Sequence, residues 1–164
     1  MSVEDRRLAQ LIRRLDMMLA RGVLRATVDS GGIQTMQIGL LAGEVADRVE
    51  RFQSYGLSAV PPPGGDVLVG FVQGNRDHGV VLAVNDRASR PRGRSLGETE
   101  LYNDQNVSVL LDREGDLRIR ARRIIIEADE TIEVTAGERI VLNAGQQIDF
   151  NAPSGVYANG TRLD

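Results

Sequence analysis

The sequence predicts an all-β protein with a short N-terminal helix, in which a small barrel is followed by an intertwined trimeric β-helix. Three observations lead to this fold class. Apolar residues recur at helical spacing over residues 3–21, short apolar strands alternate with turns over residues 22–88, and residues 123–160 repeat every eight positions. The repeat carries the most weight, because a fixed period is typical of stacked or solenoidal arrays.

The N-terminal segment, residues 1–21, is predicted to be an amphipathic helix. Its apolar side chains form one stripe: Leu8, Leu11, Ile12, Leu15, Met18 and Leu19. Ser2 with Asp5 can cap the start of the helix, and Arg21 with Gly22 suits its end. We expect the stripe to cover the next domain or to meet a neighbouring protein. A membrane-surface helix is the alternative, although acidic residues interrupt its basic face.

Residues 22–88 are predicted to form the barrel, because five or so short strands in one stretch favour that architecture. The expected strands are 23–28, 33–41, 45–52, 57–60, 67–72 and 80–84. Turn-forming residues separate them, as in the proline-rich 61–65 loop and the 74–79 hairpin connection.

Residues 89–115 are predicted to form a neck. Four arginines lie around the boundary between barrel and neck: Arg87, Arg90, Arg92 and Arg94. This run could contact nucleic acid or an acidic partner, and we favour a solvated connector. Strand character returns at 101–102 and 107–111, and again after a turn at 112–115. The β-helix is assigned to residues 116–164.

The eight-residue repeat places the recurring apolar side chains of every unit on one face, because eight is even and strand side chains alternate with period two. Ile125 and Val141 are exceptions that fall on the other face. Nine of them are predicted to face a threefold axis: Ile124, Ile126, Ile132, Val134, Ile140, Leu142, Ile148, Phe150 and Val156. Polar residues such as Glu133 and Asn143 face outward. An alanine and a turn-prone residue end each unit, so each is a strand of about five or six residues plus a sharp turn.

A single chain does not close such a β-helix. One triangular coil takes roughly eighteen residues, whereas each repeat supplies one face. Three parallel chains, each giving one face per layer, would close the coil and leave no free lateral strand edge. An antiparallel meander packed on another domain is the alternative. A meander of this kind favours Asn-Gly or Asp-Gly at its turns. The turns of the repeat carry Ala-Asp, Ala-Gly and Ala-Pro instead.

Composition limits the function further. The net charge of −3 argues against a nucleic-acid role, and the absence of cysteine removes disulfides and Cys-based zinc sites. No apolar run is long enough to span a membrane, and the charged N-terminus is unlike a signal peptide, so we expect synthesis in a cytoplasm. Aromatic residues make up 4% of the chain, which argues against an aromatic-lined ligand cleft.

No catalytic, cofactor-binding or metal site is predicted, and we expect the protein not to be an enzyme. The one histidine, His78, lies in a turn beside Asp77, where a structural role is expected rather than that of a triad base. No pair of carboxylates stands in a pocket motif that glycosidase chemistry would need. Asp112, Glu114 and Asp116 are faintly similar to a calcium loop, but the distal glutamate ligand is missing.

Several short motifs resemble the baseplate spike of Mu-like contractile-tail phages, within the baseplate assembly protein V family. They are Arg51-Phe52-Gln53-Ser54-Tyr55-Gly56, Val60-Pro61, Gly70-Phe71, Arg76-Asp77-His78-Gly79-Val80-Val81-Leu82, Asp86-Arg87, Arg90-Pro91, Gly97-Glu98 and Leu101-Tyr102. The resemblance covers residues 22–160 and is most specific over residues 50–102.

The resemblance implies an OB-type (oligonucleotide/oligosaccharide-binding) barrel followed by a trimeric β-helix. It implies a structural tail-baseplate spike of a contractile injection system, which pierces the host outer membrane and caps the tail tube. The expected partners are two further copies of the chain, a baseplate hub protein above the barrel and, transiently, the host outer membrane, with no nucleic acid. The expected location is the tail baseplate of the virion, after assembly in the host cytoplasm.

Family members often end in a His-x-His apex that holds iron. This chain departs from that pattern, because no histidine follows His78 and the remaining C-terminal donors are Asn159, Asp164 and the terminal carboxylate. We therefore expect no iron at the tip of this chain. The tip is then blunt, or another subunit sharpens it, or a metal-bearing segment follows elsewhere.

Other functions stay open. One is a nucleic-acid- or carbohydrate-binding OB module. Such a module would need aromatic side chains for stacking, and the barrel region offers few of them: Phe52, Tyr55 and Phe71. Another is the spike of an R-type bacteriocin or a type VI-like system. A hydrolase fused to a β-helix would need an additional domain, which 164 residues do not accommodate.

Overall fold

The computed structural model describes residues 2–158 and 161–163. The chain divides into two units, Met1–Arg123 and Ile124–Asp164. In the described part, the first unit contains a helix, a closed barrel and a three-stranded sheet, and the second contains one short hairpin. This content confirms the predicted mostly β class with one short N-terminal helix.

Helix α1 (Val3–Asp16) begins as predicted. The Ser2 hydroxyl accepts a hydrogen bond from the Asp5 backbone N–H at 3.0 Å, and the Asp5 carboxylate accepts one from the Ser2 N–H at 2.7 Å. The helix ends at Asp16, so the predicted end at Arg21 is wrong. Strand β1 already begins at Leu19, because residues 19–23 pair with a barrel strand and this pairing overrides the helical periodicity.

Within residues 2–158 and 161–163, no helix has both the length and the apolar character needed to cross a membrane.

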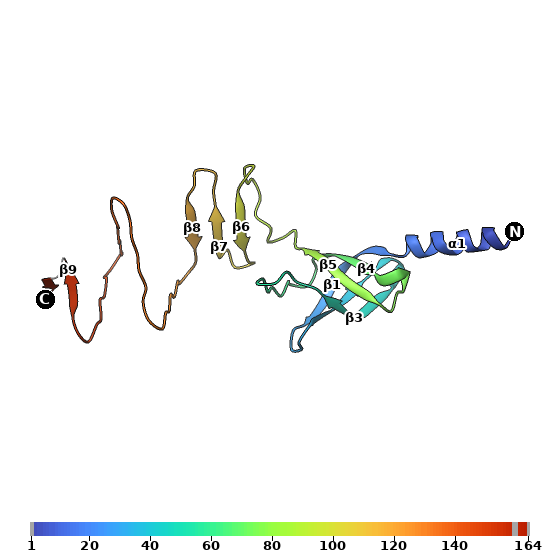
Figure 1. Ribbon diagram of the computed structural model, residues 1–164, viewed down its shortest axis with the longest axis horizontal. Helices are drawn as coiled ribbons and strands as arrows, with labels where there is room; N and C mark the ends of the chain where they lie inside the picture. Colours follow the sequence, from blue (N-terminus) through green and yellow to red (C-terminus); the bar gives the residue numbers. More distant parts are fainter. Residues whose placement is uncertain (1, 159–160, 164) are drawn as a thin grey trace. The chain divides into compact units, whose positions relative to one another are not determined.

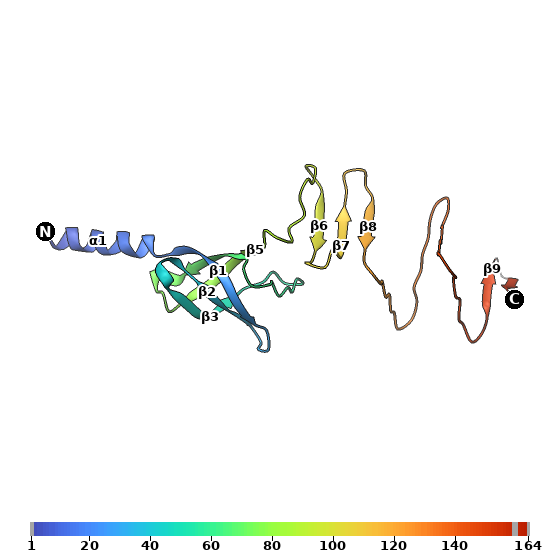
Figure 2. The same ribbon diagram turned by 180° about the vertical axis from the view of Figure 1, so that it is seen from behind.

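Five strands wind into the barrel (Figures 1 and 2). They are β1 (Leu19–Val28), β2 (Gln34–Gly39), β3 (Val45–Arg51), β4 (Asp66–Phe71) and β5 (Gly79–Asn85), with short 3₁₀ turns η1 (Leu41–Gly43) and η2 (Val72–Gly74). The barrel closes in the order β1-β2-β3-β5-β4, and β4 pairs back to β1. The β3–β5 pair is parallel and the others are antiparallel. The prediction of a small barrel built from about five short strands is confirmed.

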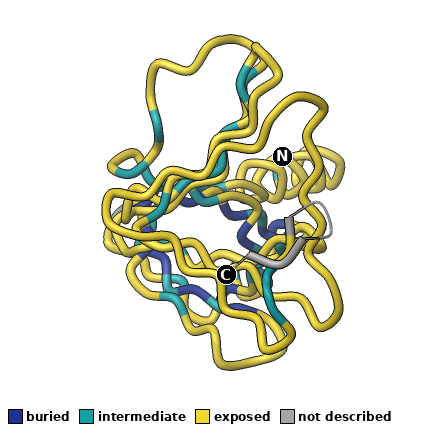
Figure 3. Tube along the Cα trace, turned by 90° about the vertical axis from the view of Figure 1, so that its left-hand side faces the viewer, coloured by how far each residue is buried: buried dark blue, intermediate teal, exposed yellow. Residues whose placement is uncertain are grey.

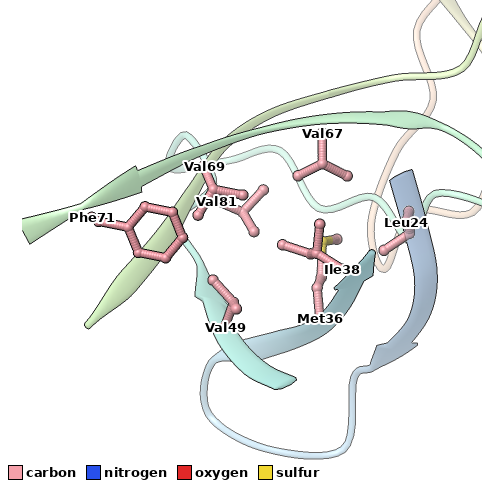
Figure 4. Packing of buried hydrophobic residues seen from close by; sticks show 8 residues of the cluster. All are labelled: Leu24, Met36, Ile38, Val49, Val67, Val69, Phe71 and Val81. Carbon is pink, nitrogen blue, oxygen red and sulfur yellow. The ribbon is translucent and has the colours of Figure 1, made fainter. Parts of the chain in front are cut away.

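The barrel interior holds the hydrophobic core of the described residues (Figures 3 and 4). Eight side chains from all five strands point toward one another there: Leu24, Met36, Ile38, Val49, Val67, Val69, Phe71 and Val81. Strand β4 buries every second residue, as period-two alternation requires. The dark-blue stretches of Figure 3 mark these buried positions.

Residues 57–60 form a loop, and the strand predicted there is wrong. The Ala59 carbonyl, which a strand ladder would need, instead accepts a hydrogen bond from Arg51 Nη1 at 2.7 Å. The same nitrogen donates to Gln34 Oε1 at 2.8 Å. Buried Gln34 in turn donates to Asp29 Oδ1 at 2.8 Å. Burial lowers the pKa of Arg51, and the nearby Asp29 opposes this shift. The network ties the long β3–β4 connection to the barrel.

A three-stranded antiparallel sheet follows the barrel. It consists of β6 (Thr99–Tyr102), β7 (Ser108–Leu111) and β8 (Leu117–Arg120). Strands were expected in these places, on both sides of the 112–115 turn. Strand β8 pairs with β7 across that turn. One sheet therefore spans the predicted boundary between neck and spike at residues 115–116.

The second unit keeps the period of the repeat without forming its strands. Bends fall at residues 129–130, 137–138 and 145–146, and a turn falls at 153–154, where turns were predicted. Figure 1 shows the trace between β8 and β9 (Val156–Ala158) reversing direction repeatedly, and no strand is assigned there. The single chain does not form the β-helix over residues 124–155, and the trimeric β-helix stays a prediction.

The segment ends in a short antiparallel hairpin of β9 (Val156–Ala158) and β10 (Thr161–Leu163). Strand β10 was not predicted. The sequence dipeptide Asn159-Gly160 between the two strands is a hairpin indicator that the octad pattern obscured. Asn159, Gly160 and Asp164, which include two of the C-terminal donors considered above, lie outside the described residues.

Candidate functional site: the octad face

The nine residues predicted to face a threefold axis are here called the octad face: Ile124, Ile126, Ile132, Val134, Ile140, Leu142, Ile148, Phe150 and Val156. The chain does not cover them. Exposed fractions of the first eight run from 46% at Ile148 to 71% at Ile126, and Val156 is half-buried. Core residues of the barrel, by contrast, are at most 6% exposed. Apolar surface of this extent normally marks a site of interaction with another molecule.

The residues predicted to face outward are exposed as well. Glu133 and Asn143 lie on the same extended segment as the octad face. An extended chain without lateral neighbours exposes both of its faces, so inside and outside become different only in an assembly. The assignment of the octad face to an axis is therefore a prediction about the assembled state.

The β6–β7–β8 sheet adds a second uncovered apolar face. Leu101 lies opposite Val109, which lies opposite Ile119, and Leu111 lies opposite Leu117. Apart from half-buried Val109, these side chains are between 50% and 62% exposed. The sequence contained the indicator, a period-two alternation of apolar and basic residues over 117–121, but the face was not recognised as one surface shared by three strands.

The opposite face of this sheet is charged and internally paired. Arg94 forms an ion pair with Glu100 at 2.6 Å. Arg118 contacts Asp112 at 3.0 Å and Asp116 at 3.1 Å, with Glu114 at 3.8 Å. The sheet thus has one polar side suited to water and one apolar side suited to a partner.

The acidic cluster at the β7–β8 turn is partly neutralised by the guanidinium group of Arg118. Asp112, Glu114 and Asp116 bring carboxylate oxygens within 4.8 Å of one another, which is the spacing of a metal site. The guanidinium of Arg118 contacts all three. A hydrogen bond from the Asp116 backbone is the main cause that lowers the pKa of Asp112, and the hydrogen bond to Asp116 raises the pKa of Arg118. This arrangement favours a structural turn.

His78 occupies a turn between η2 and β5. Its backbone N–H donates to the Asn75 carbonyl at 3.0 Å, and its own carbonyl accepts from the Val72 N–H at 2.9 Å. These contacts define the turn and agree with the structural role expected for this residue.

The basic run of the neck is partly engaged in internal contacts. Arg87 forms an ion pair with Asp66 of the barrel at 2.5 Å, and Arg94 pairs with Glu100 of the sheet. The guanidinium of Arg92 donates to the Arg87 carbonyl at 3.3 Å. These contacts favour the connector role over a free basic surface.

Comparison with known proteins identifies relatives over most of the chain. The family model described as Bacteriophage Mu Gp45, N-terminal, matches residues 21–88, which contain most of the barrel. The baseplate puncturing device gp45 of Escherichia phage Mu is 36% identical over 133 residues, which cover 81% of this chain and 68% of that protein. The Mu-like prophage FluMu protein gp45 of Haemophilus influenzae is 35% identical over 136 residues, which cover 83% of this chain and 74% of the relative.

Proposed function

This chain belongs to the phage Mu gp45 family of tail baseplate proteins, and on this premise we propose that it forms a homotrimeric spike that pierces the outer membrane of the host. Membership gives the coarse role, a spike protein of the phage tail baseplate. The trimer, the piercing step and the contacts with other baseplate components form the proposal.

The observation that carries the proposal is the uncovered octad face. Its nine large apolar residues recur at a regular spacing, and those before Val156 are exposed in the single chain. The backbone between β8 and β9 also lacks a strand ladder, although backbone N–H and C=O groups need partners when they leave water. Two further copies of the chain would provide both an apolar surface that covers the octad face and strand partners for the backbone.

The mechanism follows from this packing. A piercing spike must transmit axial force without bending or dissociating. In a prism whose three chains share every layer, the load is spread over many interchain hydrogen bonds, and no lateral strand edge is left free. Contraction of the tail sheath supplies the energy, so the spike needs neither a catalytic site nor a cofactor.

The proposed surroundings are those of the tail. The barrel and α1 dock on a baseplate hub above them, the spike caps the tail tube, and the particle assembles in the host cytoplasm before release in the virion. The basic neck connects barrel and spike without binding nucleic acid.

The proposal is tested with particles assembled without the endogenous spike and complemented with this chain. We expect tails complemented by the wild-type chain to contract on host cells and to admit a small fluorescent dye through the outer membrane. Tails complemented by Ile140→Asp serve as the variant in which the trimer is disrupted, and those with Glu133→Ala as the matched control. Dye entry that is as efficient without the chain as with it would refute the piercing role.

A further inference from the structure

Helix α1 carries an apolar stripe that its own chain leaves exposed. Leu8, Leu11, Ile12 and Leu15 lie on one side of the helix and are between 48% and 66% exposed. A 14-residue helix is marginal in water by itself, and most helices of this length are stabilised by packing an apolar face. The stripe therefore needs a cover that the single chain does not provide.

The barrel contacts α1 near its C-terminal end. The Phe71 N–H donates to the Met18 carbonyl at 2.7 Å. Gly74 of η2 lies so close that an added Cβ would come within 2.6 Å of the Arg14 carbonyl oxygen, and its φ of +72° also favours glycine. These contacts use the backbone of Arg14 in the last turn and of Met18 just after the helix, and they leave the apolar stripe exposed.

Charges of opposite sign flank the stripe. At about 100° per residue, Arg7 and Arg14 fall along one side of the stripe, whereas Asp5 and Asp16 fall along the other side. Arg14 and Asp16 differ in height by about 3 Å, as do Arg7 and Asp5. Among the described residues, no ion pair engages these arginines or Asp16.

We propose that the three α1 helices of the trimer pack in parallel against one another through this stripe. The inference rests on the proposed homotrimer and extends it to the N-terminal end of the chain. In a cyclic assembly each copy meets the next through two different surfaces. The basic side of one helix then faces the acidic side of the next at nearly the same height, so Arg14 lies near Asp16 of the neighbouring copy and Arg7 lies near Asp5.

The charge pattern favours a second copy of α1 over a membrane surface or an unrelated protein as the partner of the stripe. A helix that lies on a membrane surface carries basic residues across its whole polar face, whereas here one side of the stripe is acidic. An unrelated partner would not require two sides that are complementary to each other in sign and in height. Parallel copies of the same helix do require this.

The test uses the absence of cysteine from the chain. Leu15→Cys places one thiol in the proposed helix contact, and Gln10→Cys places one on the polar side as the matched control. A disulfide requires Cα atoms about 4.4–6.8 Å apart, so mild oxidation of the full-length protein reports the contact. We expect Leu15→Cys to form covalent dimers several-fold faster than Gln10→Cys. Leu11→Cys, at a second position on the stripe, should behave like Leu15→Cys.

A charge exchange in the Leu15→Cys background tests whether the basic side of one helix contacts the acidic side of the next. Arg14→Glu should slow the cross-linking, and adding Asp16→Arg to the same chain should restore it, because the exchanged charges meet again between copies. Light scattering on the same samples separates the two proposals. An intact trimer in which both stripe cysteines cross-link no faster than Gln10→Cys overturns the helix contact and leaves the stripe available to a hub protein. A monomer overturns the trimer itself.

Discussion

Ile140→Asp distinguishes an assembled octad face from one that stays in water. Ile140 is 53% exposed in the single chain. If the protein were monomeric, a change at such a surface position would alter the free energy of unfolding by no more than about 0.5 kcal/mol. In the proposed trimer, the same change places three carboxylates together in a dry interior.

The expected size of the effect follows from the threefold repetition. One unpaired buried charge costs several kcal/mol, so three copies cost on the order of 10 kcal/mol, before repulsion among them is counted. The whole folding free energy of a typical domain is about 5–15 kcal/mol. We therefore expect Ile140→Asp to abolish the trimer or to cause aggregation.

Gel filtration coupled to light scattering, together with urea unfolding, measures this effect. Glu133→Ala is the matched control on the outward face of the same repeat array, and it should cost no more than about 0.5 kcal/mol per chain. If both variants remain trimers with the same unfolding midpoint, the assignment of inward and outward positions is wrong.

Three further predictions concern the rest of the chain. The wild-type protein should bind DNA no more tightly than nonspecific levels at physiological salt; a gel shift at nanomolar protein that fades steeply with added salt would overturn the connector role of the neck. Elemental analysis of the purified trimer should find no tightly held iron, since no histidine follows His78, and one iron per three chains would contradict this. Arg51→Ala should lower the free energy of unfolding by about 1–3 kcal/mol, because buried Gln34 loses its donor; a urea midpoint unchanged from wild type would show that water replaces Arg51 at no cost.

The barrel could be predicted from the sequence because its strands follow simple rules. In β4, Val67, Val69 and Phe71 alternate with less buried residues, and the turns around them carry glycine, proline or aspartate. The two errors arise from contacts that the local sequence pattern does not reveal. The apolar stripe that continues through Leu19 has helical periodicity, yet Leu19 pairs with Gly70 in the barrel. The backbone carbonyl and N–H of Ala59 form hydrogen bonds with the side chains of Arg51 and Gln53 instead of with a neighbouring strand.

The turns of the eight-residue repeat could be predicted from the sequence, whereas the strands between them do not form over residues 124–155 of the single chain. The bends at 129–130 and 137–138 occur at the predicted turns because Asp129 and Gly137 favour them locally. The strands between them depend on ladder partners, which local residue preferences do not supply. The apolar face of the β6–β8 sheet was missed for a related reason, because Leu101 and Ile119 become neighbours of Val109 only once the register of three strands is known.

The mass of the native protein in solution tests the central claim most directly. One chain has a mass of 17.9 kDa. Because the proposed trimer gives neighbours to the octad face and to the backbone between β8 and β9, light scattering across a single gel-filtration peak should give about three times that mass. The same protein eluting as a monodisperse, folded monomer, with its octad segment accessible to protease, would contradict the account.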